Sequence, residues 1–281
     1  MSNNADTPRF LGLHAKPKGL IKYALMALPF ILMIALYLVA SDVRHKANPQ
    51  DKLLPSISQM ASSAQTLAFE ENKRTGTRLL WQDSAASLKR LAMGISIAAI
   101  FGLVLGVMTG VFPGAHVLLN PFLTFVSMIP PLAILPVLFI TLGVEETAKV
   151  ALITLGLFPL IARDMQLAVQ HLPGEQKTKA LTLGATAAQY TLKIVLPQVL
   201  PRLIEAVRLS LGAAWLFLIA AEAISAESGL GYRIFLVRRY LAMDIILPYV
   251  LWITLLGFLI DLGLRGTLRL CFPWYASSKN K

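Results

Sequence analysis

The amino-acid sequence predicts an all-α, polytopic membrane protein with six transmembrane helices. Hydrophobic residues make up 56% of the 281 positions and charged residues only 15%, and the mean hydropathy is +0.65. A chain of this composition has too little polar surface to coat a water-soluble globule of its size. Runs such as 95–107 and 251–260 are apolar on every side, which favours helices over the alternating strands of a β-barrel.

Six apolar runs are long enough to cross a bilayer as helices, and they cover residues 20–41, 88–111, 118–142, 147–169, 203–225 and 245–264. The first run exceeds the ~7–15 apolar residues of a cleaved signal peptide, so we interpret it as a retained span. The expected organisation is a polar tail at 1–19, a first span at 20–41, a linker at 42–87, a transmembrane core at 88–268 and a second tail at 269–281.

The chain is basic, with a formal net charge of +11. Lys and Arg concentrate near the ends of the apolar runs, a distribution that favours anionic lipid headgroups over nucleic acid. Basic residues also precede the first run and follow the last, which predicts that both termini are cytoplasmic. The basic residues of the 42–87 linker argue against this topology, although acidic residues accompany them and long loops weaken the rule.

The linker should contain its own local structure. Residues 51–68 have apolar side chains at helical spacing, and residues 70–77 have the composition of a solvated turn. The segment 79–91 predicts either an amphipathic helix on the membrane surface, with Trp81 as its interfacial anchor, or a plain connecting loop.

No cluster of His, Asp, Glu and Cys has the spacing of a metal site or a catalytic site, so we expect neither, and no bound cofactor. The histidines are widely separated, at positions 14, 45, 116 and 171, and Cys271 is the single cysteine. Glu145 and Glu146 are adjacent in a short turn, and a solvated turn is favoured there over acid–base chemistry.

Prolines concentrate in the third run, where Pro136 follows Pro130 and Pro131. Each proline removes an amide donor and crowds the preceding turn, so we expect a kink or partial unwinding. Backbone groups freed by a break need partners in protein or in a water-filled cavity. The run therefore predicts either a pathway lined by Thr124, Ser127, Pro130 and Pro131 or a kink that serves packing alone.

Glu222 is an ionisable residue near the outer end of the fifth run. Such a group is costly in lipid unless it faces a cavity, a partner or the interface, so it is a further candidate for the pathway or for gating, with interfacial snorkelling as the alternative. Residues 229–231 then predict a tight turn, followed by Arg233, Arg238 and Arg239. These arginines predict either a surface that attracts an anionic solute or an acidic partner, or a solvated, headgroup-facing segment.

The segment 173–197, between the fourth and fifth runs, is the most informative part of the chain. Pro173 and Gly174 mark a helix start, Glu175 suits a helix N-terminus, and Pro197 and Pro201 mark an end. Two short helices fit between them.

Small side chains within this segment recur at helical spacing. Leu181, Gly184, Ala185 and Ala188 fall at i, i+3, i+4 and i+7, which predicts one face that a protein groove can approach closely.

This segment resembles the EAA loop of binding-protein-dependent ABC transporter permeases, whose pattern is EAA, three residues, Gly, nine residues, Ile, one residue and Leu-Pro. In this register the matched positions are Thr178, Lys179, Ala180, Gly184, Ile194, Leu196 and Pro197. Thr178 stands where the family has the Glu that helps to dock the ATPase, and Glu175 lies one turn earlier. The resemblance assigns these residues to an ATPase-coupling loop.

Other segments are similar to the nitrate, sulfonate and taurine branch of these permeases, and the similarity covers about residues 50–275. They are LLPS from Leu53, FVSMIPPLAILPVLFITLG from Phe125, FPL from Phe158 and AEAISAESGLGYRIF from Ala221. The resemblance implies a type I importer fold, a homodimer in the bacterial inner membrane, cytoplasmic ATPase subunits that bind the ATP, and a periplasmic substrate-binding protein. The 42–87 linker would then be periplasmic.

The sequence thus predicts a transport subunit rather than an enzyme. It would import a small solute, such as a sulfonate, taurine, nitrate or a related anion. The chain has no phosphate-binding Gly-rich loop followed by Lys-Ser or Lys-Thr, so ATP must be handled by a partner. An ion-coupled secondary transporter would need coupling-ion groups at mid-membrane, and a membrane enzyme would need a convergent catalytic cluster. Neither feature is evident in the sequence.

Overall fold

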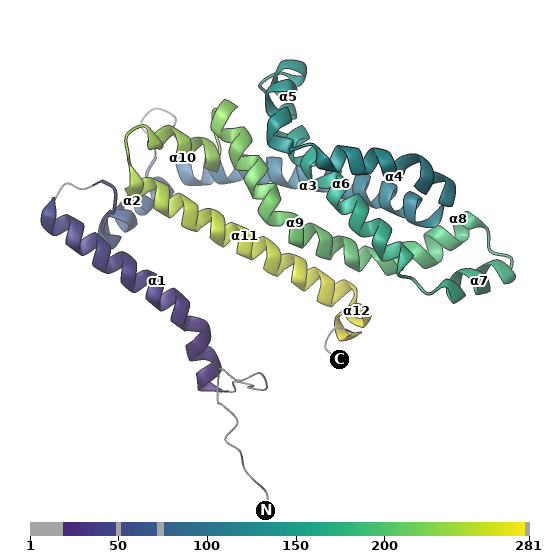
Figure 1. Cartoon of the computed structure of the whole chain (residues 1–281). Coiled ribbons are helices and arrows are strands. Elements are labelled where there is room, and N and C mark those ends of the chain that lie inside the picture. The colour runs from purple at the N-terminus through teal and green to yellow at the C-terminus, as the bar shows by residue number, and fades with distance from the viewer. Residues whose placement is uncertain (1–18, 49–51, 72–75, 279–281) are drawn as a thin grey trace, which may run out of the picture.

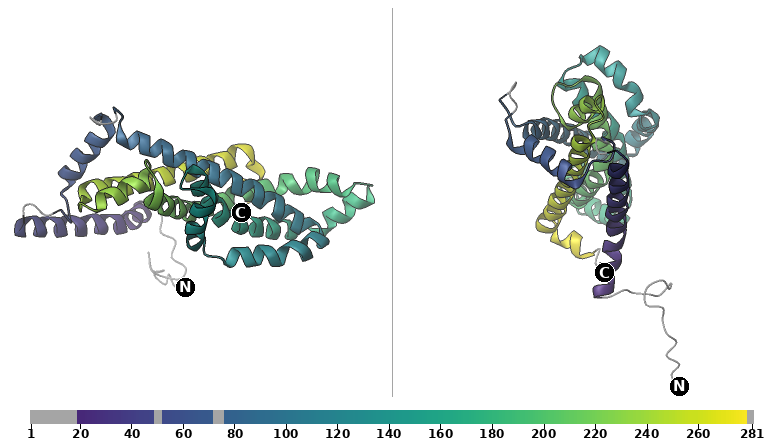
Figure 2. Two further views of the ribbon diagram at one scale, coloured as in Figure 1. Left: turned by 90° about the horizontal axis from the view of Figure 1, so that it is seen from above. Right: turned by 90° about the vertical axis from the view of Figure 1, so that its left-hand side faces the viewer.

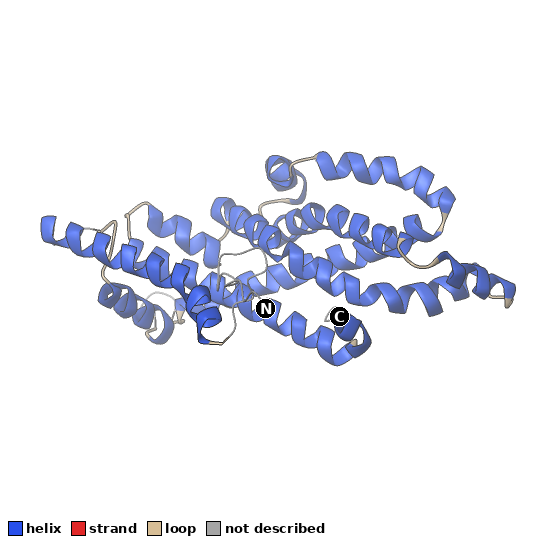
Figure 3. Cartoon of the chain, turned by 60° about the horizontal axis from the view of Figure 1, so that its bottom comes forward, coloured by secondary structure: helices blue, strands red, loops and turns tan. Residues whose placement is uncertain are grey.

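The structure is a computed structural model that describes residues 19–48, 52–71 and 76–278, and this part of the chain is helical without any strand. The helices that are long and apolar enough to span a membrane are α1 (Leu20–Ala47), α3 (Leu79–Val111), α6 (Glu146–Gln170), α11 (Met243–Cys271) and the continuous helix formed by α8 (Ala187–Tyr190), η2 (Thr191–Val195) and α9 (Leu196–Ser225). The bent pair of α4 (Pro113–Met128) and η1–α5 (Pro131–Ile134 and Leu135–Leu142) makes a sixth span when the two halves are counted together. The expected all-α membrane architecture is confirmed (Figure 3).

Short helices occupy the two ends of an elongated bundle (Figures 1 and 2). One end, called the α7–α8 end, carries α7 (Gly174–Thr182) and α8, while α12 (Pro273–Ser278) follows α11 and lies short of that end. The other, called the α10 end, carries α2 (Ile57–Phe69) and α10 (Leu230–Arg238). The loop that resembles the coupling loop therefore projects from one end of the bundle.

Helix α6 forms the centre of the bundle, with α3 on one side and α9 on the other. Gly94, Gly102, Gly106 and Gly110 of α3 lie against successive turns of α6, where an added Cβ would come within 2.7 Å of an α6 atom. On the α9 side, the ring of Phe217 covers Gly156. Helices in lipid gain little from hydrophobic burial, so close approach through small residues supplies the packing energy.

Ion pairs and a hydrogen bond fasten α9 to its neighbours toward the α7–α8 end. Arg202 pairs with Asp164 of α6 at 2.6 Å, and Arg208 pairs with Asp261 of α11 at 2.8 Å. Tyr275 of α12 donates a hydrogen bond of 2.7 Å to Glu205 of α9. Burial, together with this bond, raises the pKa of Tyr275 to about 12, so its hydroxyl remains a donor.

The proline-rich run is broken as expected. Helix α4 ends at Met128, Ile129 and Pro130 have extended backbones, and the chain resumes as η1 from Pro131 at a bend of 81°. Extended geometry is what a following proline imposes on the residue before it. The run 118–142 is therefore a bent pair of helices and not one straight span.

The segment 79–91 differs from both of its predicted forms. It is neither a surface helix nor a loop but the first turns of α3, which is 33 residues long. Its polar side chains Asp83, Ser84, Ser87 and Arg90 are buried in the bundle. Partners on distant helices satisfy these groups, and the local sequence pattern cannot reveal them.

Helix α1 stands apart from the bundle (Figure 1). Its side chains are almost all exposed, and its ties are to the segment just before α2. Tyr37 donates to the carbonyl of Pro55 at 2.6 Å, and Ser41 donates to the carbonyl of Leu54 at 3.1 Å. The apolar surface of α1 is therefore available to lipid or to another subunit.

The glycine contacts of α3 generate a stability prediction. Gly102→Leu should destabilise the protein by roughly 1–3 kcal/mol, because a Cβ there would lie 2.6 Å from Ile161 Cγ2 and 3.2 Å from the backbone nitrogen of Ala162. The thermal unfolding midpoint in detergent micelles measures the effect. Gly263→Leu is the matched control, since a Cβ at Gly263 meets no atom within 4 Å. Equal unfolding midpoints for the two variants would contradict the packing argument.

Candidate functional site

A network of buried charged groups closes the α10 end of the bundle. Asp83, Ser87 and Arg90 of α3 are spaced at i, i+4 and i+7, so one face of the helix presents all three side chains. Glu222 of α9 and Glu146 of α6 meet that face. These α3 residues were missed as site residues, although polar side chains at helical spacing beside an apolar run were a signal for them.

Glu222 is fully enclosed, with an exposed fraction of 0%. Its carboxylate accepts hydrogen bonds from Ser87 Oγ at 2.8 Å, Arg90 Nη1 at 2.6 Å and the backbone N–H of Gly231 at 2.8 Å. A buried carboxylate needs this degree of pairing to remain charged. Glu222 therefore joins α9 to α3 and α10. It neither snorkels to the interface nor faces a channel in this structure.

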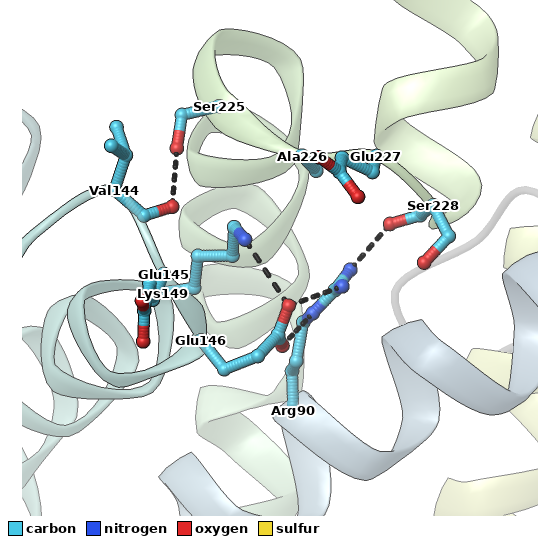
Figure 4. A pocket seen from close by; sticks show the side chains of 9 residues that line it. All are labelled: Arg90, Val144, Glu145, Glu146, Lys149, Ser225, Ala226, Glu227 and Ser228. Carbon is cyan, nitrogen blue, oxygen red and sulfur yellow. Dashed lines mark hydrogen bonds and ion pairs between the residues drawn. The ribbon is translucent and has the colours of Figure 1, made fainter.

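Arg90 connects three helices and a turn. Besides Glu222, its guanidinium binds both carboxylate oxygens of Glu146 on α6 and the carbonyl of Ser228 in the α9–α10 turn (Figure 4). Lys149 adds a contact of 3.2 Å to Glu146. The Glu146 side chain is 56% exposed, in line with the predicted solvated position, but its carboxylate is also paired with Arg90, which lies 56 residues earlier in the chain. Glu145 is exposed.

Asp83 connects α3 to α10 and α11. Its carboxylate is fully buried and accepts from the N–H of Gly229 at 3.0 Å, Arg233 Nε at 2.8 Å and Tyr249 Oη at 3.0 Å. Burial works to lower the pKa of Arg233, but the hydrogen bond and charge of Asp83 outweigh it and raise that pKa. Arg233 is thus a structural ion-pair partner, whereas Arg238 is exposed.

The glycines of the α9–α10 turn let the backbone approach these carboxylates. Gly229 has a φ of +136°, and a Cβ there would lie 2.5 Å from the Glu222 carboxylate carbon. At Gly231, a Cβ would lie 2.9 Å from the backbone of Ile219. Only glycine allows the two N–H groups to reach Asp83 and Glu222.

A pocket of about 630 Å³ lies beside Arg90 (Figure 4). Its walls are the turn between α5 and α6 and the turn between α9 and α10, and Ser225 Oγ joins the two by donating to the carbonyl of Val144 at 3.0 Å. The residues that line it are Arg90, Val144, Glu145, Glu146, Lys149, Ser225, Ala226, Glu227 and Ser228.

The 173–197 segment forms two short helices joined by a tight turn. Helix α7 follows Pro173, with Glu175 in its first turn as expected. Gly184 has a φ of +79°, so the chain turns there, and Thr186 caps α8 through a reciprocal bond pair with Gln189. The predicted face of small side chains at Leu181, Gly184, Ala185 and Ala188 was wrong, because α7 ends at Thr182 before the helical spacing could continue.

Pro197 and Pro201 do not end the segment. They lie within α9, and η2 is a π-helical stretch that connects α8 directly to α9. The wider π turn removes the clash between the Pro197 ring and the preceding turn, which an ordinary α-helix would suffer. The second short helix is therefore the beginning of a long continuous one.

The positions that match the EAA pattern divide into an anchored group and an exposed group. Ala180 is buried beside Tyr190 and Val195, Ile194 packs against the same small core, and Leu196 is partly buried. Glu175, Thr178, Lys179, Gly184 and Pro197 are exposed. Leu183, at the tip, is 88% exposed. The loop thus has an internal core and presents both polar and apolar side chains outward.

The other pathway candidates lie together on the bent pair. Thr124 Oγ1 donates to the carbonyl of Asn120 at 2.8 Å, and Ser127 Oγ donates to that of Thr124 at 2.7 Å. Pro130 and Pro131 form the break that follows. Glu222 does not share this segment and belongs to the network at the α10 end.

Within the described residues, no group of three or more His, Cys, Asp or Glu side chains could hold a metal ion. His116 contacts Gln166, and His45 and His171 contact carbonyls of their own helices. His14 lies outside the described residues.

The buried network generates a second stability prediction. Glu222→Leu should destabilise the protein by about 3–5 kcal/mol, because it removes one of the two carboxylates that pair with the buried Arg90 and leaves the N–H of Gly231 without its acceptor. Thermal unfolding in detergent tests this. Glu227→Leu serves as the control, since Glu227 is exposed in the same region. A Glu222→Leu protein as stable as the control would show that the network is not structural.

The chain matches the family model described as "Binding-protein-dependent transport system inner membrane component" over residues 98–266. It is 34% identical over 222 residues to the taurine transport system permease protein TauC of Escherichia coli (strain K12), covering 79% of this chain and 80% of the relative. It is 30% identical over 257 residues to the putative aliphatic sulfonates transport permease protein SsuC of the same strain, covering 90% and 94%.

Another relative is the bicarbonate transport system permease protein CmpB of Synechococcus elongatus, 33% identical over 186 residues, with 65% of this chain and 66% of the relative covered. Among solved structures, an inward-facing form of the MetNI methionine ABC transporter matches with a TM-score of 0.59 at 21% identity. That match covers 66% of this chain and 93% of the other, and it shows a shared fold.

Proposed function

The chain belongs to the family of binding-protein-dependent transport system inner membrane components, as the permease subunit of an ABC importer, and we propose that its solute is a small anion of the sulfonate class. The single observation that carries the proposal is the relationship to TauC over 79% of the chain. The relatives are named as permeases for taurine, aliphatic sulfonates and bicarbonate, solutes that share a compact anionic group. The family consists of transport subunits, and we therefore propose no enzymatic role for this chain.

The proposed assembly is a homodimer in the bacterial inner membrane, with an ATPase subunit against each α7–α8 loop and a binding protein at the α10 end. In this orientation both termini are cytoplasmic, in line with the basic residues that flank the first and last spans. ATP is bound by the ATPase subunits, and this chain needs no cofactor of its own. The exposed Leu181 and Leu183 side chains support the docking role, because contact with an ATPase subunit would remove their apolar surface from water.

Transmission follows from the continuity of the helices. Because α8 passes into α9 through η2 without a loop, a displacement of α8 moves α9 as one body. Helix α6 enters the same loop from the other side. The bent pair α4–α5, with Thr124, Ser127, Pro130 and Pro131, is proposed to line the pathway, since its break leaves polar backbone at membrane depth.

The docking role gives a mutational prediction. Gly184→Trp should reduce co-purification of the ATPase at least tenfold while membrane insertion persists, because a bulky side chain on the turn blocks close approach. Gly114→Trp is the control, since that glycine also lies in open space, at the start of α4.

Gly184 has a positive φ, so a second variant separates docking from backbone strain. Leu183→Asp should give the same loss without straining the turn, because the Leu183 side chain is 88% exposed. Normal recovery of the ATPase with both loop variants would count against the coupling role.

The transport function is tested in proteoliposomes that contain the permease, its ATPase and its binding protein. Uptake of radiolabelled taurine should require enclosed ATP and the binding protein, and unlabelled aliphatic sulfonates should compete. Glucose, which is uncharged, is the matched control solute. Uptake that follows an ion gradient and proceeds without the ATPase would instead establish a secondary transporter.

A further inference from the structure

The pocket beside Arg90 lies at the outer ends of the two helices that carry the coupling loop. One wall includes Glu146, the first residue of α6, and the other includes Ser225, the last residue of α9. Helix α6 has 25 residues, which corresponds to about 37 Å at 1.5 Å per residue. The pocket and the α7–α8 loop are therefore at opposite ends of the same helix pair.

The charges that line the pocket favour a cationic ligand. Two cations, Arg90 and Lys149, stand against three carboxylates, Glu145, Glu146 and Glu227, which leaves a formal charge of −1. Glu146 already binds both cations. The carboxylates of Glu145 and Glu227 are exposed at the rim, and no cation of the described residues lies within 4.0 Å of either one. The unmet charge of the pocket is thus negative.

The form of the pocket points to a side chain of a partner protein rather than to a metal ion or a solute in transit. No group of three metal-ligating side chains exists among the described residues. The walls are two interhelical turns at the end of the bundle, whereas a pathway would run between spans. In the proposed orientation, these turns face the compartment of the binding protein.

We propose that this pocket is the socket for an arginine or lysine side chain of the extracytoplasmic binding protein, an inference that rests on the proposed function. The basic group would enter the pocket between the two turns, where the rim residues Glu145 and Glu227, one from each turn, supply carboxylates. Engagement of both rim residues would fix the spacing between the start of α6 and the end of α9.

The packing below the pocket would pass this constraint toward the ATPase. Arg90 ties Glu146 of α6 to Glu222 of α9 and to the Ser228 carbonyl, so both walls are fastened to one side chain. Close contact of Phe217 with Gly156 continues the α6–α9 interface toward the loop. Docking at the α10 end would therefore change the relative positions of α6 and α9 at the α7–α8 end.

The test uses the complete permease–ATPase complex in nanodiscs, titrated with its purified, substrate-loaded binding protein. The double variant Glu145→Gln/Glu227→Gln should raise the half-saturating concentration of binding protein for ATPase stimulation about tenfold. It should also weaken the salt dependence of that concentration, while the basal ATPase rate stays unchanged. The control is Glu70→Gln/Glu71→Gln, which removes the same charge from exposed residues of the α2–α3 connection that do not line the pocket.

Two results would overturn the proposal that the pocket binds a basic side chain of the binding protein. One is a half-saturating concentration that matches the control variant. The other is an unchanged affinity for the binding protein together with an altered dependence of uptake on solute concentration, which would make the pocket a solute site. Failure of the proposed function itself would show separately, as a wild-type complex whose ATPase rate does not respond to any concentration of binding protein.

Discussion

The ion pair between Arg90 and Glu222 is the interaction on which the arrangement of the α10 end depends. A carboxylate with no exposure to solvent is tolerated only where donors surround it, and Glu222 draws those donors from α3 and from the turn into α10. Arg90 in turn requires acceptors from α6 and from the α9–α10 turn. Satisfying two buried charges therefore fixes four elements relative to one another, in a region where apolar packing alone specifies little.

Glycine contacts extend this order along the bundle. The α3 glycines allow α6 to approach so closely that the two helices act as one unit, and Phe217 over Gly156 joins α9 to it. Ion pairs such as Arg202–Asp164 repeat the fastening near the α7–α8 end. A long pair of helices fixed at both ends is the kind of rigid element that the proposed transmission of movement requires.

The sequence predicted those features that depend on local composition. The apolar runs, the break at Pro130–Pro131 and the helix start at Glu175 follow from length, proline chemistry and capping, and each is present. Features that depend on distant partners were not predictable. The polar residues of 79–91 suggested a surface helix because their partners on α9, α10 and α11 are more than 130 residues away. Likewise, Pro197 suggested a helix end because the compensating π turn has no sequence signature of its own.

The 173–197 segment departs from its family pattern at Thr178, and the nearest carboxylate in α7 is that of Glu175. Thr178 Oγ1 donates to the carbonyl of Gly174 at 3.3 Å, so this side chain turns toward its own helix. Glu175 lies three residues earlier, hence on the same face, and about 4.5 Å nearer the helix start. There it also meets the positive end of the helix dipole, which stabilises its charge. The position of Glu175 therefore suits both roles that the sequence leaves open for it, a substitute for the family carboxylate and a cap for α7.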